Sequence, residues 1–120
     1  MGRKYLKEPN YELASKEFSK AVMTFEFILK NNPKMKDFKG EITSMMKEII
    51  LPAYSNLSLC YMKLERWGLV ITMANQVIQS EPDNIKNLYR RGIARKWRKD
   101  YDGAIDDLER VRKLDKEMDT

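Results

Sequence analysis

An internal repeat of 34 residues constrains the fold of this 120-residue chain more than any other feature of its sequence. Shifting the chain by this period superimposes residues of similar size or polarity. The matched pairs are Asn56 with Arg90, Ser58 with Gly92, Trp67 with Tyr101, Val70 with Ala104, and Val77 with Val111. A period of this length is typical of two-helix units that stack in an array, because a single unit cannot bury its own apolar face. The repeat therefore predicts an all-α fold of antiparallel helix pairs.

The matched positions indicate which kind of repeat this is. Small residues recur where paired helices would cross, at Ser58, Gly92 and Ala104, and small side chains let helices approach closely. An aromatic residue, Trp67 or Tyr101, precedes the second helix of each unit, and we expect these rings to pack between repeats. Together, the period, the small residues and the aromatic residue resemble the tetratricopeptide repeat (TPR), which forms a superhelix of helix pairs.

A third copy of the pattern lies near the start of the chain. Its spacing matches that of the last copy, so that Tyr11, Ala14, Phe18 and Ala21 correspond to Tyr101, Ala104, Leu108 and Val111. Tyr11 and Trp67 are 22 residues further apart than one period, so an insertion separates the first two repeats. We expect one TPR domain over 1–116, with a truncated first repeat at about 1–34, further repeats at about 48–82 and 83–116, and a tail at 117–120.

The expected helices follow from apolar periodicity and from residues that start or stop a helix. They cover about 1–7, 10–31, 41–64, 67–80, 83–97 and 101–115, with a polar loop over 34–40. Pro82 cannot continue a helix, and Asp83 or Asn84 can cap the next one. Because the first helix starts within a repeat and no helix follows the last, we expect a fragment of a longer protein. Apolar edges exposed at both ends would favour dimerisation.

Composition argues against several kinds of function. The chain contains no histidine, which removes the commonest general base and the commonest metal ligand. Its single cysteine, Cys60, cannot form an internal disulfide, and its apolar surroundings in the sequence predict a buried, inert thiol. No run of about 18 apolar residues predicts a membrane span. We therefore expect a cytoplasmic, non-catalytic chain without a cofactor, a bound metal or membrane contact.

The net charge of +5 favours an anionic partner. Lys86 and Arg90 stand four residues apart, and Asn56 and Lys63 stand seven apart, so each pair returns to one helix face. In stacked helix pairs of this kind, the first helices line the concave surface. We therefore expect these four residues to share a basic groove suited to a peptide carboxylate.

Two stretches, 54–64 and 86–92, resemble the second and third repeats of the large immunophilins, which are FKBP-type and cyclophilin-type peptidyl-prolyl isomerases with C-terminal TPR domains. The resemblance implies a clamp for the acidic C-terminal peptide of the heat-shock-protein-90 chaperone, Met-Glu-Glu-Val-Asp. Asn56, Lys63, Lys86 and Arg90 match the clamp positions of the family. Arg3 stands where the family often has Asn, and the clamp lysine of the first repeat would precede Met1. The 70-kilodalton heat-shock chaperone is a second candidate partner.

Other readings remain open. The groove could bind a different protein partner, such as a helix without a free carboxylate, or the chain could be a non-catalytic part of a peptidyl-prolyl isomerase. A nucleic-acid role lacks stacking aromatics and a known motif. The remaining charges are expected to face solvent, or, for the basic residues, to pack along their stems. They comprise Arg91, Arg95, Lys96, Arg98 and Lys99 on the basic side, and Asp106, Asp107 and Glu109 on the acidic side.

Overall fold

The computed structural model describes residues 10–118, and within that range every regular element is a helix. The helices are α2 (Tyr11–Asn31), a 3-10 helix (Pro33–Phe38), α3 (Lys39–Met45), a π-helical turn (Met46–Ile50), α4 (Leu51–Lys63), α5 (Trp67–Ser80), α6 (Ile85–Trp97) and α7 (Tyr101–Met118). The all-α prediction is confirmed. The helix expected over 1–7, with Arg3, lies outside the described residues.

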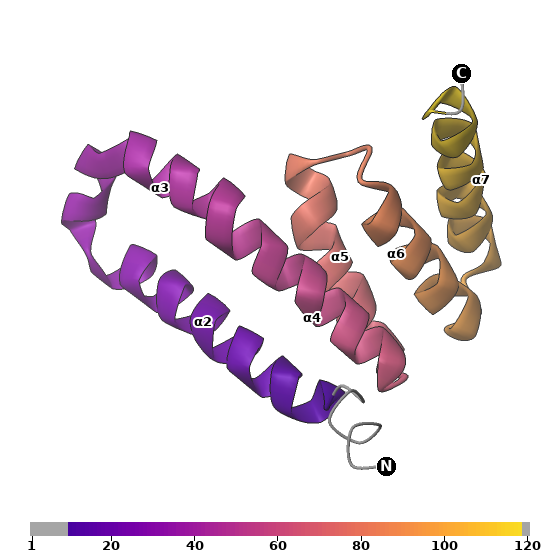
Figure 1. Cartoon of the computed structure of the whole chain (residues 1–120), viewed down its shortest axis with the longest axis horizontal. Coiled ribbons are helices and arrows are strands. Elements are labelled where there is room, and N and C mark those ends of the chain that lie inside the picture. Colours follow the sequence, from indigo (N-terminus) through magenta and orange to yellow (C-terminus); the bar gives the residue numbers. More distant parts are fainter. Residues whose placement is uncertain (1–9, 119–120) are drawn as a thin grey trace, which may run out of the picture.

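Successive helices pack side by side as a layered array (Figure 1). α2 packs on α4, α4 on α5, α5 on α6 and α6 on α7, and the alternate helices α4 and α6 are also in contact. This arrangement is the one expected for stacked helix pairs, in which α4 with α5 and α6 with α7 form two consecutive units. The contact between α4 and α6 matters most for function, because it places the first helices of both units side by side.

Asparagine side chains cap the starts of the α-helices α2 and α6. The Oδ1 atom of Asn10 accepts a hydrogen bond from the backbone N–H of Leu13 at 3.0 Å, and Oδ1 of Asn84 accepts one from the N–H of Asn87 at the same distance. Each bond satisfies a backbone donor that has no partner inside its helix. Of the two caps proposed for α6 from the sequence, Asn84 is therefore the one used.

The helices α4 and α6 end in the same way, 34 residues apart. Glu65 and Lys99 adopt left-handed backbone angles, with φ of 57° and 68°. Around Glu65, the N–H of Arg66 donates to the carbonyl of Tyr61 at 2.8 Å. The equivalent bond after α6 joins Asp100 to the carbonyl of Arg95, also at 2.8 Å. Both ends are Schellman motifs, in which a left-handed residue closes the helix and glycine is usually preferred.

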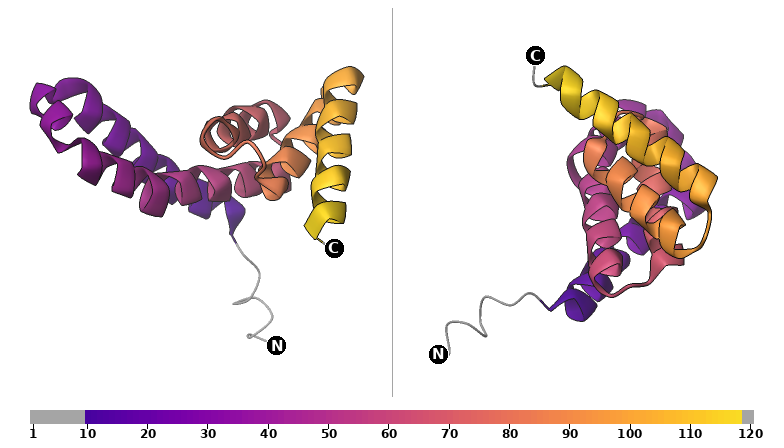
Figure 2. Two further views of the ribbon diagram at one scale, coloured as in Figure 1. Left: turned by 90° about the horizontal axis from the view of Figure 1, so that it is seen from above. Right: turned by 90° about the vertical axis from the view of Figure 1, so that its right-hand side faces the viewer.

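The insertion lengthens helices rather than adding a loop. The stretch 34–40, expected as a polar loop, forms a 3-10 helix and the start of α3. From there a continuous helical rod runs to Lys63, and together with α2 it forms an arm to one side of α5, α6 and α7 (Figure 2). The helix expected over 101–115 continues to Met118.

A π-helical turn interrupts the rod just before Pro52. In this turn the N–H of Leu51 donates to the carbonyl of Met46, five residues earlier, instead of four. Proline has no N–H to donate, and its ring crowds the carbonyl four residues before it. The wider turn relieves this crowding, and it inserts one residue into the helical register. Apolar periodicity alone does not reveal such an insertion.

The main apolar core lies where α2 crosses the rod. Buried side chains from both helices and from α5 form it: Val22, Phe25, Ile50, Leu51, Ala53, Tyr54, Leu57 and Val77. The C-terminal unit instead relies on close approach. A Cβ atom added to Gly92 would lie 3.0 Å from the side chain of Leu108, and Ala104 is buried against the same helix pair. The expected role of small residues at the crossings is therefore confirmed.

Asp107 was expected to face solvent but is buried, and Arg91 and Arg95 are paired with it. Asp107 is only 3% exposed, and Arg91 binds both of its carboxylate oxygens, at 2.9 and 2.7 Å. Arg95 donates to the same carboxylate at 3.0 Å, and Arg91 also donates to Asn75 at 2.9 Å. A buried charge must be paired, and this cluster ties α5, α6 and α7 together. The order of charges in the sequence does not show which of them pair in this cluster.

The two repeat aromatics behave differently. Trp67 stacks on Trp97, with ring centroids 5.8 Å apart and planes 8° apart, so it packs between units as expected. Tyr101 is 58% exposed, contrary to expectation. Tyr101 begins α7, the last helix of the described range, so no following helix is present there to cover it.

Candidate functional site

A groove runs between the first turns of α4 and α6. It has a volume of about 400 Å³ and combines apolar, cationic and acidic side chains. We call it the α4/α6 groove, and its lining residues are Lys47, Leu51, Pro52, Ser55, Val77, Glu81, Asp83, Asn84, Ile85 and Lys86. Both acidic residues have partners already. Glu81 accepts a hydrogen bond from Asn84, and Asp83 is paired with Arg110. The two lysines are exposed and belong to no ion pair within the described chain.

Arg90 crosses from α6 to α4 at one end of this groove. Its Nη1 atom donates to the carbonyl of Ser55 at 2.8 Å, to Ser55 Oγ at 3.3 Å and to Ser58 Oγ at 3.1 Å. Burial lowers the pKa of Arg90, and the nearby Cys60 opposes that shift, yet an arginine remains charged at neutral pH. All these bonds use one nitrogen, so among the described residues Nε and Nη2 stay available to an incoming acceptor.

A buried asparagine holds this arrangement in place. Asn87 is completely buried, accepts a hydrogen bond from Ser58 Oγ at 2.7 Å and donates to Ser55 Oγ at 3.1 Å. The same two serines bind Arg90, so one polar network fixes both the helix contact and the guanidinium. In the 34-residue register, Asn87 falls on Ala53. The polar amide of Asn87 at the repeat position of the methyl group of Ala53 is the sequence feature that marks this role.

The structure brings together only some of the predicted site residues. Lys86 lines the α4/α6 groove, and Arg90 contacts Ser55, which directly precedes the exposed Asn56. Lys63 is exposed at the last residue of α4, and the helix rise places it about 10 Å along the axis from Asn56. Lys63 therefore lies about two turns beyond Asn56 on α4, and Arg3 lies outside the described residues.

Lys47 lines the groove although its sequence position did not suggest it. Eight residues separate Lys47 from Ser55, which places them about 80° apart around a regular α-helix. The π-helical turn, which contains Lys47, absorbs one residue before Ser55 and reduces that angle to about 20°. Lys47 thus joins the face that carries Ser55, opposite Lys86. The sequence signal was Pro52, whose position inside a long predicted helix called for a local irregularity.

The chemistry offered here is recognition. The groove presents cationic and amide donors over an apolar floor, which suits an extended anionic segment. The thiol of Cys60 is buried, as expected, and burial raises its pKa. In the part of the chain that the structure describes, no group of three or more acidic, cysteine or histidine side chains could hold a metal. No described helix is long and apolar enough to cross a membrane.

Comparison with known proteins points to one group of relatives. No family model matches the chain. The chain is 30% identical over 115 residues to the peptidyl-prolyl cis-trans isomerase PASTICCINO1 of Arabidopsis thaliana. This match covers 96% of the chain and 17% of that protein. The chain is 29% identical over 113 residues to the mouse peptidyl-prolyl cis-trans isomerase FKBP4, covering 94% of this chain and 23% of the relative.

A third relative extends the pattern. The FK506-binding protein 59 of Drosophila melanogaster is 25% identical over 114 residues, which covers 95% of this chain and 24% of that protein. The chain spans less than a quarter of the length of each of these three relatives. Over nearly its whole length, the chain is therefore similar to one segment of large FKBP-type immunophilins.

Proposed function

We propose that this chain is a protein–protein interaction domain of a co-chaperone immunophilin, and that it binds the acidic C-terminal peptide of the heat-shock-protein-90 chaperone. The observation that carries the proposal is Arg90, which α4 holds by one nitrogen while its remaining donors are free among the described residues. Lys86 and Lys47 flank the adjoining groove. Similarity to FKBP-type isomerases over nearly the whole chain supports the same function.

Each basic residue has a distinct part in this proposal. Arg90 gives charge-assisted hydrogen bonds to a carboxylate of the peptide, and Lys86 binds a second carboxylate beside it. Asn56 donates to the terminal aspartate from α4. Lys63 contributes longer-range attraction, because it lies further along the helix. Since exposed charges are screened over about 8–10 Å at moderate ionic strength, binding should weaken as salt is added.

The isomerase activity of the relatives belongs, in this proposal, to another part of a longer protein. The chain matches less than a quarter of each isomerase, so in this proposal it tethers a folding enzyme to a cytoplasmic chaperone and the isomerase site lies in another segment. The acidic C-terminus of the 70-kilodalton heat-shock chaperone is the second peptide to test. A prolyl-isomerase assay on this chain should give no activity above the uncatalysed rate.

Calorimetric titration of Met-Glu-Glu-Val-Asp, with a C-terminally amidated twin, tests the proposal directly. We expect micromolar binding of the free acid and at least tenfold weaker binding of the amide. Lys86→Ala and Arg90→Ala should each weaken binding at least tenfold, a loss of about 1.4 kcal/mol. Lys113→Ala, an exposed lysine on α7, is the matched control and should change little. Undetectable binding of the free acid to a folded sample would refute the proposal.

A second candidate function rests on the apolar floor of the same groove. Leu51, Pro52, Val77 and Ile85 line it and would suit an amphipathic segment that carries no free carboxylate. In that case the domain would be an adaptor for a different protein partner. The amidated peptide distinguishes the two functions, since equal binding of acid and amide would favour the adaptor.

A further inference from the structure

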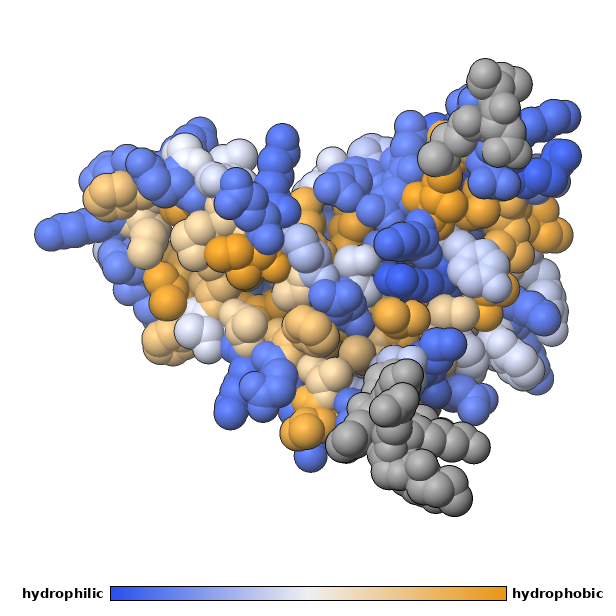
Figure 3. Space-filling model, in the orientation of Figure 1, coloured by the Kyte–Doolittle hydropathy of each residue, from blue (hydrophilic) through white to orange (hydrophobic). Residues whose placement is uncertain are grey.

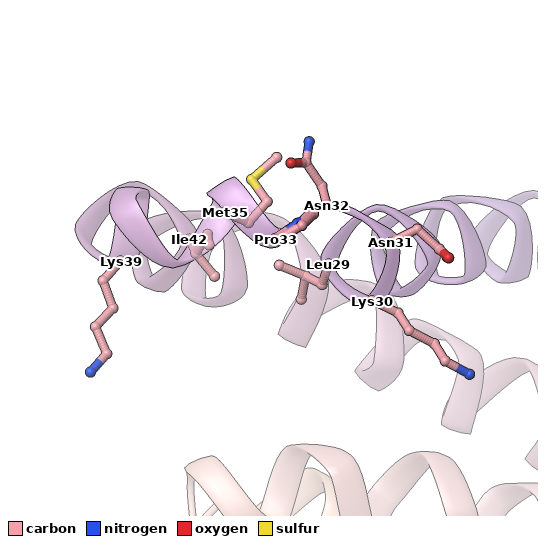
Figure 4. A pocket seen from close by; sticks show the side chains of 8 residues that line it. All are labelled: Leu29, Lys30, Asn31, Asn32, Pro33, Met35, Lys39 and Ile42. Atoms are coloured by element: carbon pink, nitrogen blue, oxygen red, sulfur yellow. The ribbon is translucent and has the colours of Figure 1, made fainter.

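A second hollow lies at the far end of the arm, away from the α4/α6 groove. It has a volume of about 770 Å³ and forms where α2 ends, the 3-10 helix turns and α3 begins (Figure 4). We call it the tip pocket, and its lining residues are Leu29, Lys30, Asn31, Asn32, Pro33, Met35, Lys39 and Ile42. Its volume is in the range of about 300–1,000 Å³ that is usual for ligand sites.

The pocket is cationic on both sides and apolar between them. In Figure 4 the side chains of Lys30 and Lys39 extend toward the same side from α2 and α3, and Leu29 and Ile42 lie between them. No carboxylate lines the pocket. Neither lysine belongs to an ion pair among residues 10–118. By contrast, Glu81 and Asp83 share the lining of the α4/α6 groove with its two lysines.

Apolar surface continues around the pocket. Phe38, which is 53% exposed, lies between the lining residues Met35 and Lys39 in the sequence, and Met45, which is 41% exposed, follows Ile42. Figure 3 shows hydrophobic surface over the arm, with hydrophilic side chains at its edges. Apolar patches rimmed by charge are typical of interaction sites on soluble proteins. The insertion therefore builds a surface that the repeat architecture itself does not require.

We propose that the tip pocket binds a short acidic segment of a partner protein, in which one bulky apolar side chain stands between carboxylates. The apolar side chain packs against Leu29 and Ile42, and the flanking carboxylates pair with Lys30 and Lys39. Because both lysines point to one side of a concave site, they match a narrow peptide better than a flat bilayer surface. No free C-terminus is needed, so this site does not depend on the carboxylate clamp.

A peptide blocked at both ends tests the proposal without engaging the clamp. The probe is fluorescein-labelled Gly-Glu-Glu-Leu-Asp-Asp-Gly with a C-terminal amide, titrated with the whole chain and followed by fluorescence anisotropy. We expect saturable binding that weakens at least tenfold in the double variant Lys30→Glu with Lys39→Glu, since both favourable contacts become repulsive. Replacing the leucine of the probe with glycine should weaken binding to a similar degree.

The matched control is the double variant Lys16→Glu with Lys20→Glu. It makes the same change in net charge on exposed residues of α2 outside the tip pocket, so binding should stay within about threefold. Circular dichroism should show the same helix content for both double variants. The proposal is overturned if the probe does not bind, if both double variants weaken it equally, or if only phosphatidylserine vesicles bind in a Lys30- and Lys39-dependent manner.

Discussion

The arm and the C-terminal helix pair, α6 with α7, hold their helices together by different interactions. In the arm, α2 and α4 bury large apolar side chains such as Phe25 and Leu57, and polar contacts lie at the margin. In the C-terminal pair, α6 and α7 approach over Gly92 and share the buried carboxylate of Asp107. Apolar packing tolerates changes in helix length, whereas a bidentate ion pair fixes one geometry. The insertion accordingly lies in the arm.

The largest expected effect comes from removing the buried carboxylate. Asp107→Ala would leave Arg91 and Arg95 without their shared partner, and Arg91 is only 17% exposed. Breaking a buried ion pair on one side typically costs about 3–5 kcal/mol. Urea unfolding followed by circular dichroism should show this loss. The exposed neighbour Asp106→Ala is the control, and an equal loss there would mean that the buried ion pair does not stabilise the C-terminal helix pair.

Adding one methyl group to a glycine in each region should give opposite results. Gly92→Ala would force a Cβ to within 3.0 Å of Leu108, and overpacking costs roughly 1–3 kcal/mol. Gly40 in α3 has nothing within 4 Å of that position, so Gly40→Ala should stabilise the helix by about 0.5–1 kcal/mol. Thermal melts of both variants would check the difference. If Gly92→Ala were neutral, the close approach of α6 and α7 would not matter for stability.

The free energy of unfolding should depend on pH through Tyr54, a residue of the arm. Burial, followed by a hydrogen bond to Glu26 and its charge, raises the pKa of Tyr54 to about 12 from an ordinary value near 10. Between pH 10 and 12 the unfolded chain therefore releases this proton while the folded chain keeps it. Stability that is fully present below pH 10 should be lost across that interval, by an amount on the order of 1–2 kcal/mol.

The measurement is the urea midpoint as a function of pH. Tyr54→Phe should show a shallower decline between pH 10 and 12 than the parent chain, because it has no phenol to ionise. Tyr89→Phe, an exposed tyrosine on α6, is the matched control. Identical slopes for the parent chain and Tyr54→Phe would mean that the arm does not protect this phenol.

The smallest effect should be the same in both regions. Glu65→Gly and Lys99→Gly each replace a left-handed residue at the end of a first helix, where glycine has no steric penalty. We expect each to stabilise the chain by about 0.5–1 kcal/mol in thermal melts. Lys96→Gly, at a right-handed helical position in the last turn of α6, should instead destabilise it by a similar amount. Unequal effects at positions 65 and 99 would show that the two helix ends are not equivalent.

Sequence reasoning predicted the helical array well, because it depends on local signals. The 34-residue period, the cap at Asn84 and the small residue at Gly92 each act within a few turns or through a simple steric rule. Pairing of Arg91 with Asp107 could not be predicted in this way. It depends on two helices facing each other at one register, and exposed and buried charges have the same pattern in a sequence.

The candidate site was predicted less completely than the fold. Lys86 and Arg90 follow from helical spacing, and the structure places both beside α4. Lys47 was missed because the π-helical turn changes the angle between it and Ser55. Asn87 was missed because its role depends on the serines of another helix. Residue identity was visible in each case, but the geometry that gives it a function was not.

The π-helical turn also fixes the angle of rotation, about the rod axis, between the two ends of the rod. If Met46–Ile50 wound as a regular α-helix without losing a residue, everything before this turn would rotate by about 100° about the rod axis. The tip pocket would then face a different direction relative to the α4/α6 groove, while each site kept its own residues. The winding of this one turn thus sets which two partners can be held side by side, without altering what either site recognises.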